Sequence, residues 1–407
     1  MTSPISPLKN RWAAVALCVA INACVTSAMA AFTPILLTVY LNASYFAASV
    51  FMIVATLAAS AAIHVLGKVG DVPQRRYPIL IVSALCGVAG ALALTLATSY
   101  SSALLVFVTL FAVAGSLFPQ LMALAFVYDR KSAPIIRAVA SCGWVVGPPV
   151  GGLIVTLQSP TAIFYAIAAA YGLLLFALSL MALLLPNAEG RSTNVEASAA
   201  ASHEVRQGSL STLILVLATV HFLIAICALG VPWRIVELGG TQSDVGVAFA
   251  IAAAVEIPII ACAGFLRRRV GPAQMIVAAC FTLALYFLAA SLAPGPIGMI
   301  VVSFFNGAAT GTMMGLSLIV IQDRLPDRPG YASSIYSNML RLSYVAALLA
   351  GGGIAQTISV AAIFWVAAAT ALCLCLGLIV WRPLGPIGSL SSSRAKRGDR
   401  EIKASAD

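Results

Sequence analysis

Charged residues are scarce in this chain: Asp, Glu, Lys and Arg make up 9% of its 407 residues, against about 25% in an average soluble domain. Hydrophobic residues make up 61%. So little charge excludes a water-soluble globular protein of this length, and we expect lipid to solvate most of the surface. We expect helices, because a helix satisfies its backbone polar groups internally. The short alternating strands of a membrane barrel are missing from the pattern.

The sequence also lacks the patterns that enzymes and cofactor sites carry. None of the nine cysteines stands at a metal-ligand spacing with a histidine, and none indicates a disulfide framework. There is no Walker-type phosphate loop, catalytic triad or metal-binding cluster in the sequence. We therefore expect no ATP hydrolysis, no other enzymatic activity and no cofactor.

Twelve apolar runs predict twelve transmembrane helices, since each is long enough to cross the bilayer. In the first half they are Trp12–Leu36, Ser44–Leu66, Tyr77–Ala97, Ser101–Val127, Pro134–Leu157 and Ala162–Leu185. In the second half they are Ser211–Val231, Asp244–Leu266, Ala273–Leu292, Ile297–Ile321, Tyr331–Gln356 and Val360–Trp381. The predicted fold is an all-α membrane protein with two six-helix bundles, residues 1–185 and 211–382. The polar segment 186–210 is a predicted cytoplasmic linker, and 383–407 a basic cytoplasmic tail.

The placement of positive charge predicts the orientation of these helices. With the N-terminus in the cytoplasm, all but three of the 23 Lys and Arg fall in cytoplasmic segments. Arg234 falls on the other side, and Arg137 and Arg341 fall within predicted spans. Cytoplasmic loops of membrane proteins carry such an excess. We expect both termini in the cytoplasm of a multi-pass inner-membrane protein, and the net charge of +10 does not indicate a nucleic-acid partner.

The two halves resemble each other weakly. Asp129-Arg130 closes the fourth predicted span and Asp323-Arg324 closes the tenth. Such a repeat of six helices, with the solute site between the halves, resembles the architecture of the major facilitator superfamily.

The loop after the second span resembles the signature of that superfamily at the same place. It carries a glycine, an aspartate four residues later and two basic residues: Gly67, Asp71, Arg75 and Arg76. The glycine allows close helix packing, and the charged residues can pair across the cytoplasmic face. The resemblance implies a gating role, in which the cluster latches the halves in one state. The alternative is a basic loop that only obeys the orientation rule. The corresponding loop of the second half, 264–269, contains no aspartate.

The fifth span carries a longer motif, G-x-x-x-G-P-x-x-G-G, which the sequence matches at every fixed position. The matching residues are Gly143, Gly147, Pro148, Gly151 and Gly152. Small residues four apart let two helices approach closely, and proline inside a helix removes a backbone donor. In the superfamily this motif marks exporters that exchange a solute for protons. The alternative is an ordinary glycine-rich packing face.

Several stretches narrow the resemblance to the sugar efflux transporter family. They are Phe118–Leu121, Ala123–Ala125, Trp144–Pro149, Glu237–Gly239, Val255–Ile259, Gln322-Asp323, and Ser334–Asn338 with Arg341. This resemblance implies export of sugars such as glucosides and galactosides, driven by protons.

Glu256 lies in the middle of the eighth predicted span. A charge near the bilayer centre costs on the order of 2.5–3.5 kcal/mol on insertion scales. Burial favours the protonated form of a carboxyl group, which can then carry a proton. Glu256 is the candidate proton carrier, with pairing to Arg341 as the alternative. His221 is a second candidate for the proton path, or a buried histidine with a local partner.

Polar side chains within the spans are the candidate solute-binding residues. Amides and guanidinium groups can bind sugar hydroxyls, and aromatic rings can cover the apolar face of a pyranose. The candidates are Asn22, Gln120, Arg137, Trp144, Asn306, Tyr336, Asn338 and Arg341. Each could instead pack between helices, and either arginine could reach the cytoplasmic surface.

The sequence therefore favours a monomeric secondary transporter that exports a sugar or sugar-like solute by proton antiport and alternating access. Its predicted partners are the small solute, protons and the lipid bilayer. A multidrug or metabolite exporter of the same superfamily is the alternative. A transport-inactive sensor is disfavoured, because the linker and tail are too short for a signalling domain.

Overall fold

The computed structural model describes residues 7–70, 72–128, 133–184, 207–325 and 328–381, and this part of the chain contains helices and no strands. The helices of the first half are α1 (Pro7–Ile35), α2 (Tyr45–Gly70), α3 (Arg76–Thr95), α4 (Tyr100–Val106), α5 (Ala112–Ala114), α6 (Leu117–Tyr128), α7 (Ala133–Leu157) and α8 (Ala162–Leu184). Those of the second half are α9 (Gln207–Glu237), α10 (Gln242–Val270), α11 (Pro272–Ser291), α12 (Pro296–Arg324), α13 (Pro329–Thr357) and α14 (Val360–Trp381).

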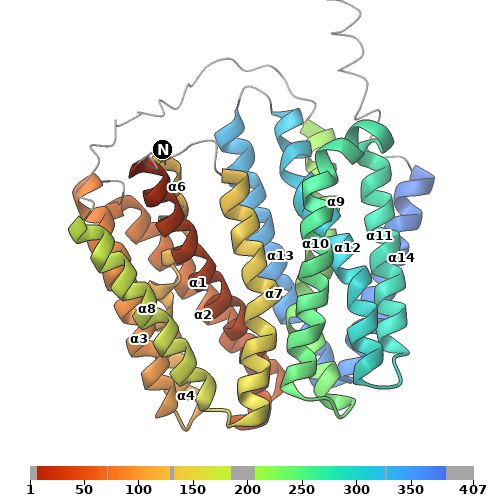
Figure 1. Ribbon diagram of the computed structural model, residues 1–407. Coiled ribbons are helices and arrows are strands. Elements are labelled where there is room, and N and C mark those ends of the chain that lie inside the picture. The colour runs from red at the N-terminus through yellow and green to blue at the C-terminus, as the bar shows by residue number, and fades with distance from the viewer. Residues whose placement is uncertain (1–6, 71, 129–132, 185–206, 326–327, 382–407) are drawn as a thin grey trace, which may run out of the picture.

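The described residues form twelve helical segments that are long and apolar enough to cross a membrane. This confirms the predicted all-α membrane fold. In Figure 1 most helices of the first half stand on the left and most of the second half on the right, while α7 and α13 overlap in the middle of the view. The predicted tail and most of the predicted linker lie outside the described residues, while residues 207–210 begin α9.

The seventh span is longer than predicted. We expected it to end at Val231, before Pro232, but α9 continues through this proline to Glu237. A proline inside a membrane helix is tolerated where neighbouring groups compensate for the lost backbone hydrogen bond. The extra turns place Trp233 and Arg234 at the end of the bundle, where both make contacts described below.

The fourth span is broken rather than continuous. A π-helical turn, η3 (Phe107–Phe111), separates α4 from α5, and a turn at Gly115 and Ser116 separates α5 from α6. At this turn the Ser116 hydroxyl lies 2.8 Å from that of Ser83 in α3, and both are buried. A similar π-helical segment, η1 (Leu36–Tyr40), ends the first span, and a short 3₁₀ turn, η2 (Pro73–Arg75), precedes α3.

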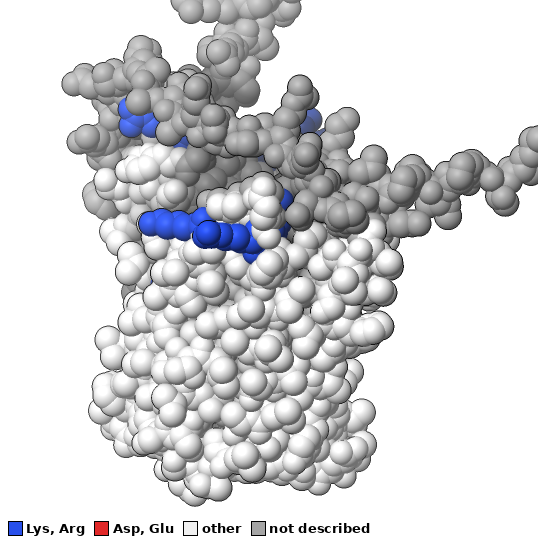
Figure 2. Space-filling model, turned by 90° about the vertical axis from the view of Figure 1, so that its left-hand side faces the viewer, with Lys and Arg blue, Asp and Glu red and all other residues white. Residues whose placement is uncertain are grey.

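The two ends of the bundle differ in charge. We name the basic end by its described residues Lys68, Arg75, Arg76, Arg267, Arg268, Arg269, Arg324 and Arg328. The opposite end carries the connections 41–44, 96–99, 158–161, 238–241, 292–295 and 358–359. Figure 2 shows a band of Lys and Arg towards the upper part of one face and no charged side chain lower down on it. This lower surface suits contact with lipid tails.

Candidate functional site

The two halves meet at the opposite end of the bundle. The indole nitrogen of Trp233 in α9 donates a hydrogen bond of 3.3 Å to the carbonyl oxygen of Pro34 in α1. The ring of Trp233 also packs edge to face against Tyr45 of α2, with centroids 4.8 Å apart. A Cβ atom at Gly352 in α13 would overlap the side chain of Ser49 in α2. These contacts join α1 and α2 to α9 and α13.

A second contact between the halves is the crossing of α7 and α10. A Cβ atom at Gly152 would overlap the backbone of Gln242, and one at Gly246 would overlap the backbone of Pro148. Because only glycine lacks a Cβ atom, it alone fits here without displacing backbone. Figure 1 shows α7 and α10 lying close together towards the bottom of the view. We call these two sets of contacts the opposite-end seal.

The other glycines of the fifth-span motif pack inside the first half. Gly143 and Gly147 face α1, where added Cβ atoms would overlap Ala23 and the hydroxyl of Ser27. The Ser27 hydroxyl donates to the carbonyl oxygen of Gly143 at 2.9 Å. A Cβ atom at Gly151 would lie 3.1 Å from the side chain of Ala28, which also belongs to α1. The motif therefore holds α7 against α1 on one side and against α10 on the other.

A matching glycine series in α12 was missed in the sequence. Gly307, Gly311 and Gly315 recur every fourth residue, and all three face α10. A Cβ atom at Gly307 would overlap the backbone of Ala252, and one at Gly311 would lie 2.8 Å from the carbonyl oxygen of Glu256. The Gly-x-x-x-Gly spacing in the sequence could have predicted this close contact between α12 and α10.

Glu256 lies midway along α10, and its side chain is half-buried. Within the described part of the chain, its carboxylate has neither an ion-pair partner nor a hydrogen-bond partner. The alternative of pairing with Arg341 is not observed in this conformation, where Arg341 is an exposed residue of α13. An isolated carboxyl group at this depth is therefore available for protonation.

Aromatic side chains form ring pairs within the bundle. Trp144 of α7 is 39% exposed, and its ring lies 6.3 Å from that of Phe249 in α10, across the interface between the halves. In the second half, Tyr336 of α13 lies 6.1 Å from the ring of His221 in α9. Trp144 is thus a candidate surface for a solute held between the halves.

The family of the chain follows from comparison with known proteins. The model of the Major Facilitator Superfamily matches residues 15–298 and 213–404, which together span nearly the whole chain. The chain belongs to the major facilitator superfamily. The members found in these comparisons are transporters, not enzymes.

Curated relatives of this major facilitator are named sugar efflux transporters. Sugar efflux transporter A of Escherichia coli is 27% identical over 315 residues, covering 74% of this chain and 79% of the relative. A putative sugar efflux transporter of Deinococcus radiodurans is 27% identical over 343 residues, covering 79% and 85%. Sugar efflux transporter C of Escherichia coli is 26% identical over 300 residues, covering 70% and 74%. These relatives confirm the resemblance read from the sequence.

Solved transporters share the fold. A crystal structure of the nucleoside transporter NupG gives a TM-score of 0.76 at 13% identity, covering 91% of this chain and 99% of that one. A peptide transporter in complex with sulfate gives a TM-score of 0.72 at 14% identity, covering 92% and 95%. At this identity the likeness concerns the major facilitator fold alone.

The predicted amide ligands have different surroundings in this major facilitator. Asn22 is 1% exposed, and neither its amide nitrogen nor its oxygen has a partner among the described residues. Gln120 instead donates to the carbonyl oxygen of Leu66 at 3.2 Å, which ties α6 to α2. Asn306 accepts a hydrogen bond of 3.4 Å from Thr310 within α12. Gln120 and Asn306 thus have partners in the protein, and the solute role of all three amides stays a prediction.

His221 is buried and has a local partner. Its Nε2 atom lies 3.0 Å from the hydroxyl of Ser317 in α12. The Tyr336 hydroxyl donates to the sulfur of Met314 at 3.6 Å. Asn338 and Arg341 are exposed and, three residues apart, share a face of α13. Arg137 belongs to α7, but its side chain lies outside the described residues.

The predicted gating loop is described in part. Asp71 lies outside the described residues, while Arg75 is exposed and Arg76 half-buried. The expected close packing at Gly67 is wrong for this conformation of the described residues, among which a Cβ atom there would meet nothing within 4 Å. Gly70 makes that contact instead: a Cβ atom there would lie 2.6 Å from the Gln120 side chain.

The second half has an ion pair at the matching place. Arg267 at the end of α10 pairs with Asp323 at the end of α12. The 264–269 loop contains no aspartate, and Asp323 of α12 supplies the acidic partner instead. The Asp-Arg pair repeated at the ends of the fourth and tenth spans was the sequence signal for this ion pair. Both side chains are substantially exposed, so the pair contributes less than about 1 kcal/mol.

Proposed function

We propose that this major facilitator exports a sugar or sugar-like solute across the bacterial inner membrane in exchange for protons, as a monomer with both termini in the cytoplasm. The observation that carries the proposal is the similarity to proteins named sugar efflux transporters over about three quarters of the chain. The isolated carboxyl group of Glu256 supports the proton component.

The opposite-end seal supports alternating access. With the basic end in the cytoplasm, the seal closes the outer end of the path between the halves. Export then requires a second state, in which the seal opens and the halves meet at the basic end. In that step α7 and α10 would separate, and the hydrogen bond between Trp233 and Pro34 would break. Such rocking of two rigid halves about a central site is how transporters with paired repeats work.

Glu256 is the residue we assign to proton exchange. Glycines of α12 hold the backbone of α10 closely, so the position of Glu256 is fixed, while its carboxylate has no partner in the described part of the chain. Ionising this group within the bilayer is costly unless water reaches it. We propose that it takes up a proton when exposed to the outer side and releases it towards the cytoplasm.

The solute would lie between the halves, against Trp144. Aromatic rings suit the apolar face of a pyranose, and the unpartnered amide of Asn22 can hydrogen-bond hydroxyl groups. Asn338 and Arg341, together on α13, are the further polar candidates from the second half. Tyr336 is the aromatic candidate on the same helix.

Purified protein in liposomes with an imposed pH gradient tests the proposal. We expect labelled methyl β-D-glucopyranoside to accumulate, and a pH gradient of one unit to support an approximately tenfold solute gradient for one exchanged proton. Accumulation of lipophilic cations with no transport of any glycoside would contradict the sugar assignment and favour a multidrug exporter.

The seal can be tested separately by replacing Trp233 with phenylalanine. This change keeps a ring against Tyr45 and removes the donor to Pro34. Since one hydrogen bond contributes about 1 kcal/mol, we expect roughly fivefold more of the open state. The measurement is the rate at which an impermeant maleimide labels Gln242→Cys in a background without the native cysteines.

The matched control for this change is Trp365→Phe, because Trp365 is a half-exposed tryptophan of α14. In the Trp365→Phe variant, the maleimide should label Gln242→Cys at the same rate as in the protein that retains Trp365. Equal labelling in the Trp233 and Trp365 variants would show that the indole hydrogen bond does not contribute to the seal.

A further inference from the structure

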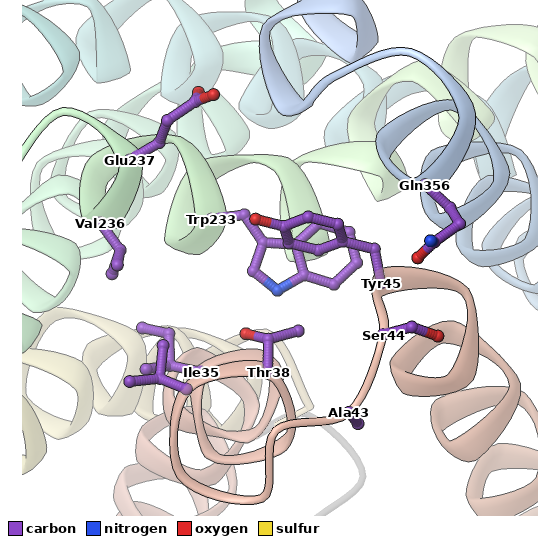
Figure 3. Close-up of a pocket in the computed structure, with 10 residues that line it drawn as sticks. Ile35, Thr38, Ala43, Ser44, Tyr45, Trp233, Val236, Glu237 and Gln356 are labelled. Atoms are coloured by element: carbon purple, nitrogen blue, oxygen red, sulfur yellow. The ribbon is translucent and has the colours of Figure 1, made fainter.

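A pocket of about 420 Å³ lies at the opposite end, next to the seal. Its volume lies within the range of small-molecule sites, about 300–1,000 Å³. Figure 3 shows Thr38, Ser44 and Tyr45 of the first half around the same pocket as Trp233 of α9 and Gln356 of α13. The lining therefore comes from both halves. Tyr45 and Trp233 also belong to the seal, whereas Thr38, Ser44 and Gln356 have no role in the path proposed above.

The side chains that line the pocket combine an aromatic wall with polar groups. Tyr45 is half-buried and is backed by the ring of Trp233, 4.8 Å away. In Figure 3 the amide of Gln356 and the hydroxyl of Ser44 lie on the side of the pocket next to Tyr45. A ring beside amide and hydroxyl groups is the chemistry that binds a pyranose, since the ring covers the apolar face and the polar groups bind its hydroxyls.

An acidic group at the rim is held in place by its neighbours. Arg234 binds one carboxylate oxygen of Glu237 at 2.7 Å and the carbonyl oxygen of Ser291 at 3.2 Å. Figure 3 shows the Glu237 carboxylate pointing away from Thr38, Ser44 and Gln356. The ion pair therefore fixes the end of α9 at the rim of the pocket.

We propose that this pocket is a second binding site for a pyranoside, on the outer side, and that its occupant holds the seal closed. The class of ligand rests on the proposed function. Because both halves line the pocket, it exists only while the seal is formed. A ligand that binds one of two conformations increases the population of that conformation. Sugar that has already been exported would therefore bind this site from the outer side and slow further export.

The test is equilibrium binding of radiolabelled methyl β-D-glucopyranoside to the purified full chain. We expect two classes of site in the wild type. Gln356→Ala should weaken one class about fivefold, as expected for one lost hydrogen bond. Ser44→Ala, a smaller change, should weaken the same class. Gln158→Ala is the matched control, because Gln158 is an exposed glutamine at the same end and outside the pocket.

Two results would overturn the proposal: wild-type protein that binds no glycoside, or unchanged binding in both the Gln356 and Ser44 variants. If only Trp144→Ala reduces binding, the pocket proposal fails while the proposed function stands. If Gln356→Ala reduces binding but liposomes export no glycoside, the proposed function fails and the pocket stands. Loss of inhibition by external glycoside in Gln356→Ala liposomes would support both.

Discussion

Replacing Glu256 by glutamine is expected to abolish gradient-driven export. Glutamine keeps the size and hydrogen-bonding groups of the side chain but cannot release a proton. In liposomes with a pH gradient of one unit, the wild type should build an approximately tenfold solute gradient, and the variant should build none. Exchange of solute for solute should persist, because the variant still changes between its two states.

Glu256→Asp is the control for this experiment. It retains a carboxyl group at the same position in α10 and should keep part of the pH dependence. An unchanged rate and pH dependence of export in Glu256→Gln would contradict the proton role. A variant that transports under no condition but binds glycoside normally would instead place Glu256 in the conformational change itself.

Replacing Gly147 by valine is expected to prevent folding or to destabilise the protein severely. A Cβ atom at this position would overlap the Ser27 hydroxyl and the backbone of Cys24. The backbone cannot shift locally, because Gly143 makes an equally close contact one turn earlier. Overpacking of this kind costs about 3 kcal/mol. The measurements are the yield of folded protein and the midpoint of thermal unfolding in detergent.

Gly172→Val is the matched control, since a Cβ atom at Gly172 in α8 would meet nothing within 4 Å. The same substitution within a membrane helix should leave yield and midpoint nearly unchanged. Equal behaviour of the two variants would show that the contact between α7 and α1 does not limit stability.

Much of the fold could be predicted because it depends on composition and local order along the chain. Apolar runs identify membrane helices without knowledge of their neighbours, since the bilayer imposes a length and excludes charge. The predictions failed where a neighbouring helix compensates for a local irregularity. Pro232 does not end α9, and the turn at Ser116 is held by Ser83 of another helix.

The site was harder to predict because a residue type does not specify its partner. Gln120 and Asn22 are both buried amides, yet Gln120 binds the end of α2 and Asn22 has no partner within the described ranges. His221 has Ser317 as a partner from a distant part of the chain. Whether a polar side chain faces a solute or another helix depends on helix rotation and packing, which the sequence pattern leaves open.

The sequence by itself determined that this chain is a helical membrane protein of the major facilitator superfamily, because scarcity of charge and the order of its motifs do not depend on contacts. Only the tertiary structure decided which glycines face which helix, that Arg267 pairs with Asp323, and that the halves close at one end around Trp233. These features depend on residues far apart in the chain, and only the packing of whole helices brings them together.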